Sequence, residues 1–192
     1  GIKNQAVIIR SLVEELKTAG TRPFIIPAMG SHGGSTPEGQ AALLKGYNIT
    51  EEFVGAPIRS SIDADLIGTT ERGAPVHADR YASSANGIVL VNRIKAHIDF
   101  EGPHESGLYK MTAAGLGKPI GAKYFHLYAS KYGYHSVMTE MAGLALKRLP
   151  VILGIGIVEN AYGETEMVRA LNSDEMREGA ISACAVEFEN GI

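Results

Sequence analysis

The sequence lacks the features that mark several specialised classes of protein. It contains one cysteine in 192 residues, which excludes an internal disulfide framework and any metal site built from several cysteines. No apolar run approaches the roughly 20 residues that a membrane-spanning helix needs. The formal net charge is −3 and no basic block occurs, so neither a nucleic acid nor a membrane surface is expected as a partner. No leader of the kind that directs export is visible, and we expect a cytoplasmic protein.

What the sequence does contain predicts an α/β fold. Hydrophobic residues make up 45% of the chain and charged residues 20%, enough to bury a core in a single domain spanning residues 1–192. Helical patterns alternate with two continuous apolar strands, 87–91 and 151–158. Such alternation is typical of a mostly parallel sheet with helices on both faces. Short β-like runs between 57 and 77, separated by Asp, Gly and Pro, predict a small β-hairpin insertion.

The remaining elements follow from periodicity and end signals. A short strand bounded by prolines, 22–28, runs into a glycine-rich loop, 29–36. An edge strand is expected at 165–170. Helical spacing of apolar residues predicts helices at 5–19, from 37 onward, at 119–128, at 135–148 and at 173–190.

The loop around His32 is the first candidate site. Four small residues follow the histidine: Gly33, Gly34, Ser35 and Thr36. Backbone N–H groups in such a loop, next to a helix N-terminus, can hold a phosphate or a carboxylate beside the imidazole. A histidine that only caps a turn is the alternative interpretation. The loop contains neither GxxxxGK[ST] nor a full GxGxxG, so it does not by itself predict a nucleotide site.

The segment 95–118 is the second candidate site, because it follows the apolar strand 87–91 and ligands collect at the carboxyl ends of strands in open α/β sheets. His97 is suited to general-base chemistry near neutral pH. Lys110 precedes an apolar turn, where a lysine can lose its proton and act as a nucleophile or tether, although a surface lysine fits the pattern equally well. His126, further on, is by itself more typical of a half-buried helix histidine than of a metal ligand.

Taken together, these four residues resemble the amino-terminal domain of the nickel-dependent lactate racemase family. That family has a histidine in a short loop after an early strand, here His32 in MGSHGGSTPEG. A second histidine follows 65 residues later, His97 in NRIKAHIDF. A lysine comes shortly afterwards, Lys110 in ESGLYKM, and a further histidine 16 residues past it, His126 in AKYFH. The resemblance extends over residues 1–161.

The resemblance implies a racemase or epimerase of a 2-hydroxy acid that works by hydride transfer to a nickel-pincer nucleotide. Lys110 would be tethered to this cofactor and His126 would be the protein ligand of nickel. His32 and His97 would be the paired acid and base, with the small residues after His32 in contact with the cofactor. The resemblance also implies that the chain is part of a longer protein, which has an upstream segment and a second α/β domain.

Two sequence differences separate the chain from family members of known activity. Those enzymes have an arginine directly after the first histidine, where this chain has Gly33, and Gly-Gly-Arg before the lysine, where it has Gly107, Leu108 and Tyr109. A substrate other than lactate, or loss of the reaction, would account for the differences.

Two other functions remain open from the sequence. One is a phosphate- or nucleotide-binding transferase that uses the loop 30–36, and the other is a noncatalytic ligand-binding module. The racemase hypothesis differs from the noncatalytic one in requiring that the side chains of His32, His97, Lys110 and His126 line one cleft.

Overall fold

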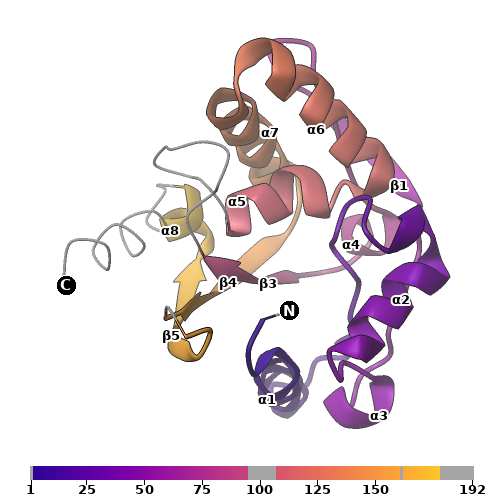
Figure 1. Cartoon of the computed structure of the whole chain (residues 1–192), viewed down its shortest axis with the longest axis vertical. Helices are drawn as coiled ribbons and strands as arrows, with labels where there is room; N and C mark the ends of the chain where they lie inside the picture. The colour runs from indigo at the N-terminus through magenta and orange to yellow at the C-terminus, as the bar shows by residue number, and fades with distance from the viewer. Residues whose placement is uncertain (1, 95–106, 161, 178–192) are drawn as a thin grey trace.

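The computed structural model describes residues 2–94, 107–160 and 162–177 (Figure 1). The helices are α1 (Gln5–Thr18), α2 (Pro37–Gly46), α3 (Glu51–Val54), α4 (Arg80–Ser83), α5 (Leu108–Lys110), α6 (Lys118–Tyr132), α7 (Tyr134–Arg148) and α8 (Ser173–Arg177). The strands are β1 (Ala64–Thr69), β2 (Pro75–Asp79), β3 (Ile88–Ile94), β4 (Val151–Glu159) and β5 (Thr165–Asn172). No helix in these ranges is long and apolar enough to cross a bilayer.

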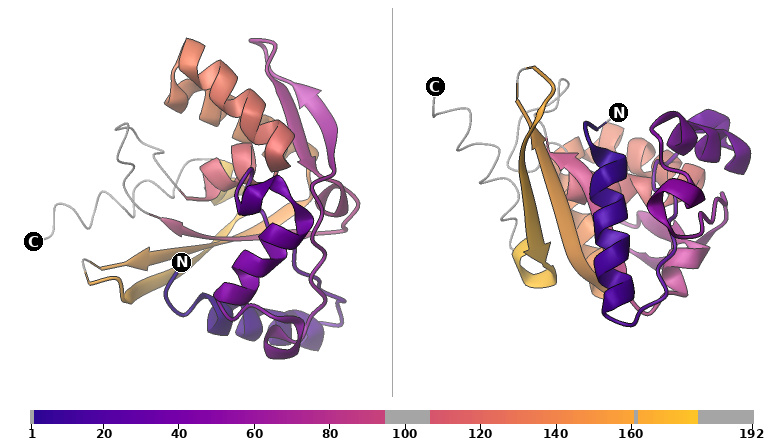
Figure 2. Two further views of the ribbon diagram at one scale, coloured as in Figure 1. Left: turned by 45° about the vertical axis from the view of Figure 1, so that its right-hand side comes forward. Right: turned by 90° about the horizontal axis from the view of Figure 1, so that it is seen from below.

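Strands β3, β4 and β5 form the larger sheet in that order, with β3 and β4 parallel. Both are the apolar runs that the sequence predicts as strands. Helices α5, α6 and α7 lie on one side of β3 and β4, and α1 lies on the other (Figures 1 and 2). Residues 154–158 of β4 are buried without alternation because β4 is the central strand, whereas exposure alternates along most of the edge strand β5.

The α/β class is confirmed, but the prediction of a mostly parallel sheet is not. Among the described strands only the β3–β4 pair is parallel, and both β4–β5 and β1–β2 are antiparallel. The chain reverses at Asn160, whose side-chain Oδ1 accepts hydrogen bonds from the backbone N–H groups of Tyr162 and Glu164. A connection this short can join only antiparallel strands, since a parallel neighbour requires a long crossover.

The predicted strand at 22–28 is extended but forms only one bridge, between Ile25 and Ile58. Ile25 donates its N–H to Pro57 O and accepts at its carbonyl from Arg59 N–H, each at 2.8 Å. Pro23 and Pro27 have no N–H to donate, so no ladder extends along this segment.

Two hydrophobic clusters lie on either side of this extended segment. The larger cluster packs β2, β3 and β4 against α5, α6 and α7, and the smaller one packs α1 against α2 and α3. Side chains of the segment alternate between them: Ile26 and Ala28 contact the larger cluster, and Ile25 and Met29 contact the smaller. The loop that follows, 30–36, therefore lies at the junction of the two clusters.

The predicted hairpin insertion is present as β1 and β2, which lie beside α6 (Figures 1 and 2). The imidazole of His77 on β2 stacks on the ring of Tyr124 on α6, with centroids 5.6 Å apart and planes 4° from parallel. The helices expected at 5–19, from 37 onward, at 119–128 and at 135–148 correspond to α1, α2, α6 and α7. Helix α8 begins at Ser173 as expected, and the rest of that predicted helix, 178–190, lies outside the described residues.

Candidate functional site

The loop that carries His32 is held in a fixed backbone conformation. Gly33, Gly34 and Ser35 all have left-handed backbone angles, with φ of 66°, 64° and 57°. A Cβ atom added at Gly39, in the first turn of α2, would lie 1.9 Å from the carbonyl oxygen of Gly33. The loop thus rests directly on the start of α2, in a conformation that favours glycine at several positions.

His32 is exposed and its ring is fixed by one hydrogen bond. Nδ1 lies 2.7 Å from the carbonyl oxygen of Met29. A carbonyl can only accept, so Nδ1 carries the hydrogen and the neutral ring has its lone pair on Nε2. The ring does cap a turn, as the alternative interpretation supposes, but Nε2 takes no part in that contact and can serve as a base.

Several backbone N–H groups of this loop and of the first turn of α2 donate within the loop. His32 N donates to Met29 O, Ser35 N to His32 O, Thr36 N to Gly33 O, and Gly39 N to Thr36 Oγ1, at 3.0–3.3 Å. Donors that are already paired cannot also wrap a phosphate. These bonds fix the backbone around the histidine.

Lys110 and His126, sixteen residues apart, are close in space. Lys110 ends α5 and precedes a π-helical turn (Met111–Gly115), whereas His126 lies on α6 with its ring centroid 6.1 Å from that of Tyr134. Partial burial lowers the pKa of His126, and the nearby ammonium of Lys110 lowers it further. A lowered pKa keeps the imidazole neutral at neutral pH, which is the form that binds a metal.

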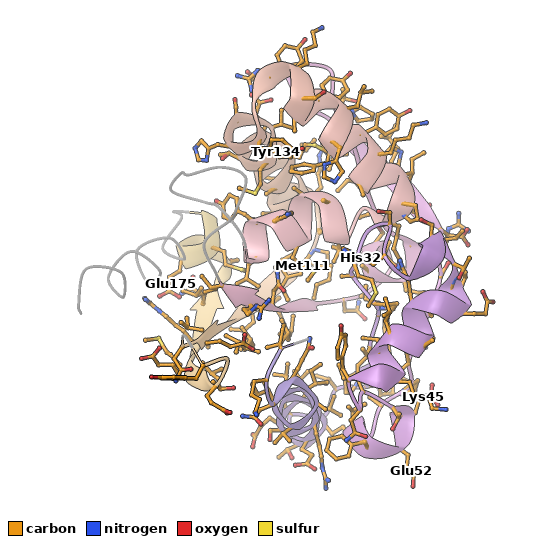
Figure 3. The ribbon with its side chains drawn as sticks, in the orientation of Figure 1. His32, Lys45, Glu52, Met111, Tyr134 and Glu175 are labelled. Carbon is orange, nitrogen blue, oxygen red and sulfur yellow. The ribbon has the colours of Figure 1, made fainter. Side chains whose placement is uncertain are left out.

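The His32 loop packs against the turn that follows Lys110. The N–H of Gly30 donates to the carbonyl of Gly115 at 3.1 Å, and a Cβ at Gly115 would lie 2.6 Å from Ala28 O. Figure 3 shows His32 and Met111 on these neighbouring segments. Loop, π-helical turn and α6 thus meet, and π-helical turns are frequent at functional sites.

His97 lies outside the described residues, as do the neighbouring residues of the segment 95–106. The residues that flank this segment are themselves neighbours, since a Cβ at Gly107 would lie 3.5 Å from Cγ1 of Ile94. The side-chain amide of Asn92 donates to Gly107 O at 3.0 Å. Both flanks therefore lie at the carboxyl end of β3, next to the helix that ends at Lys110.

Sequence reasoning missed a buried polar cluster formed by Gln40, Asp79 and Lys118, whose exposed fraction is 0% in each case. Lys118 Nζ lies 3.1 Å from Asp79 Oδ2 and donates to Pro27 O at 2.7 Å and to Gln40 Oε1 at 3.2 Å. Burial lowers the pKa of Lys118, and Asp79 opposes that change. The available signal was a single lysine within the apolar, small-residue run GLGKPIG.

The donor set determines what kind of metal could bind here. Within the described ranges, no three His, Cys, Asp or Glu side chains form a group that could hold a metal ion. His126 offers one imidazole nitrogen, within electrostatic reach of the Lys110 side chain. These residues fit a metal whose other donors belong to a cofactor, and they do not fit a metal held by protein side chains alone.

Comparison with known proteins identifies the family of this chain. A family model described as the lactate racemase N-terminal domain matches residues 2–106, more than half of the chain. The structure resembles the lactate racemase apoprotein from Thermoanaerobacterium thermosaccharolyticum with a TM-score of 0.71, at 17% identity over 93% of this chain. The chain spans 45% of the length of that protein, and comparison with curated proteins gave no significant match. The chain therefore belongs to the lactate racemase N-terminal domain family.

Proposed function

We propose that this chain is the amino-terminal part of a racemase or epimerase of a 2-hydroxy acid, and that it works with a nickel-pincer nucleotide. One observation supports this most: Lys110 and His126 come from different helices, yet they lie near enough that the lysine charge adds to the effect of burial in lowering the pKa of the histidine. The His32 loop packs against the turn between them. A tether, a metal ligand and a base would thus share one face of the molecule.

Each residue has a role that its surroundings suit. Lys110 would carry the cofactor on its amine, and His126 would give its ring nitrogen to nickel, consistent with a lowered pKa. When bound, the cofactor supplies an electron-poor ring that can accept a hydride from the α-carbon of the substrate. The protein must then remove the proton of the substrate hydroxyl group, because hydride leaves readily only from the alkoxide.

His32 is suited to take that proton on Nε2. The resulting imidazolium would be stabilised by Met29 O, which already accepts from Nδ1 at 2.7 Å. A racemase acts on both enantiomers and needs a base for each, so we assign the second base to His97. Inversion would require that the hydride return to the opposite face of the carbonyl carbon and that the other histidine, protonated at the start, give its proton to the resulting alkoxide.

The small residues after His32 would let the cofactor come close to the backbone. We assign Gly33, Gly34, Ser35 and Thr36 to cofactor binding. A Cβ at Gly34 would meet no other atom within 4 Å, so this side of the loop is open.

We also propose that residues 1–192 form one α/β domain and that the complete protein adds an upstream segment and a second α/β domain. The arginine that follows the first histidine in active relatives is replaced by Gly33. We therefore propose a 2-hydroxy acid other than lactate as substrate, bound with the help of those additional segments.

Intact mass and nickel content of the full-length protein test the assignment. After expression with cofactor-making enzymes, the wild type should carry added mass and nickel, Lys110→Ala should lack both, and His126→Ala should keep the mass and lose nickel. Lys123→Ala, which removes an exposed lysine from α6, is the matched control. A wild type without added mass or nickel would overturn the proposal. A transferase is favoured instead if mononucleotides raise the melting temperature equally in wild type and His126→Ala.

A further inference from the structure

The cluster of Gln40, Asp79 and Lys118 is fully paired and leads to the His32 loop. An ammonium group has three N–H donors, and Lys118 Nζ has three oxygens in range, at 2.7, 3.1 and 3.2 Å. These oxygens come from the segment before the loop (Pro27), from β2 (Asp79) and from α2 (Gln40). A single side chain thus connects α6 with three other parts of the fold.

Gln40 links Lys118 to the His32 loop by hydrogen bonds to both. Because Lys118 can only donate, the Gln40 amide must turn Oε1 toward it, which directs Nε2 the other way. Nε2 then donates to the carbonyls of Gly30 at 2.9 Å and of His32 at 3.3 Å. Flipping the amide would set its N–H groups against the ammonium and take a donor away from the carbonyls of Gly30 and His32, so the orientation is fixed.

The position of Lys118 itself is strongly determined. Its φ is 59°, a left-handed conformation that residues other than glycine rarely adopt. Asp79, its partner, also accepts at Oδ1 from the N–H groups of Tyr81 at 2.7 Å and Ala82 at 3.1 Å, which caps α4. Strained backbone persists only where the surroundings determine it, and such residues gather at functional sites.

We propose that Lys118 and Gln40 are positioning residues that set the place of the His32 ring relative to Lys110 and His126. Lys118 is the first residue of α6, which carries His126, and Gln40 holds the carbonyl of His32 itself. Neither side chain has to touch the substrate for this role. The inference rests on the function proposed above and extends it to two residues that lie behind the reacting groups.

The test is Gln40→Glu in the full-length, cofactor-loaded protein. A carboxylate keeps the contact with Lys118 but removes both N–H donors and places an oxygen beside the two loop carbonyls. We expect kcat to fall by about a hundredfold, the typical effect of misplacing a reacting group by about 1 Å, while KM changes little. Gln5→Glu makes the same chemical change at the start of α1, outside the cluster, and should match the wild type.

A second measurement does not depend on activity. The ring nitrogens of His32, observed by ¹⁵N NMR in the same proteins, should report the Nδ1–H tautomer in wild type and Gln5→Glu, and a mixture of tautomers in Gln40→Glu. If Gln40→Glu does not fold, Gln40→Met removes the same donors without adding charge, and the same results are expected for it.

The outcomes separate the two proposals. Unchanged kcat and unchanged His32 signals in the Gln40 variants would overturn the positioning role in an active racemase. Altered His32 signals in a protein that takes up no cofactor and racemises no hydroxy acid would support the positioning of the ring and overturn the proposed function.

Discussion

Replacing Lys118 by methionine measures how much the buried ion pair contributes to folding. Methionine fills the space of the lysine stem but leaves the Asp79 carboxylate, whose exposed fraction is 0%, without a countercharge. Oδ2 of Asp79 has no hydrogen-bond partner in the described residues apart from this ion pair. Removing one member of a buried pair typically lowers the free energy of unfolding by about 3–5 kcal/mol. Against a total of roughly 5–15 kcal/mol, that is a large fraction.

Urea unfolding followed by circular dichroism gives the free energy of unfolding of each variant. Thermal unfolding should show a melting temperature lower by roughly 6–20 °C for a chain of this size. Lys118→Met combined with Asp79→Asn removes both charges and keeps Oδ1 as the cap of α4, so its destabilisation should be smaller than the sum of the single changes by about 2 kcal/mol. A loss below about 1 kcal/mol for Lys118→Met, or strict additivity in the double variant, would refute the reasoning.

Three further changes test other parts of the structure. Lys110→Met should raise the pKa of His126, measured by NMR titration, because it removes the nearby ammonium while partial burial remains. Gly39→Ala should destabilise the protein by about 1–3 kcal/mol in urea unfolding, since its Cβ would lie 1.9 Å from Gly33 O. Burial alone would raise the pKa of Glu159, but the Lys3 N–H and the Arg93 guanidinium hold it below 4.5. This contribution to the free energy of unfolding is present above pH 4.5 and is lost as the pH falls through the lower pKa that Glu159 has in the folded protein. In Glu159→Gln the free energy of unfolding should therefore fall less steeply as the pH is lowered.

The lysine and glycine changes each have a matched control. Lys147→Met removes an exposed lysine from α7 and should leave the pKa of His126 unchanged. Equal effects of both lysine variants would contradict the electrostatic influence of Lys110 on His126. Gly46→Ala lies at the end of α2, where a Cβ meets nothing within 4 Å, and should be neutral or stabilising by about 0.5–1 kcal/mol. If the free energy of unfolding depends on acid pH in the same way in wild type and Glu159→Gln, the lowered pKa of Glu159 is contradicted.

Elements with strong local signals were predictable from the sequence. The apolar runs predicted β3 and β4, and the periodicity of apolar residues predicted helices such as α1 and α7. The direction of β5 was not predictable, because it depends on the turn at Asn160 rather than on the strand residues. The segment 22–28 has the composition of a strand, but its prolines leave it with a single bridge.

The candidate site was predictable only in part, for a similar reason. Spacing drew attention to Lys110 and His126 as a pair, and the structure brings them within electrostatic reach. The role of Lys118 was not visible, because it depends on Gln40, 78 positions away in the chain. The sequence around a lysine does not show whether its ammonium is buried, because the oxygens that bind it come from distant parts of the chain.

The bend between α5 and α6 makes the positions of Lys110 and His126 depend on how many residues separate them. In an unbroken α-helix, residues sixteen apart would be separated by about 24 Å along the axis. The π-helical turn and the left-handed residue Lys118 redirect the chain, so that the two side chains come near enough for their charges to interact. Adding one residue to α6 ahead of His126 would rotate its ring by about 100° around the helix axis and turn it away from the amine. The number of residues between them is therefore as much a part of the site as the residues themselves.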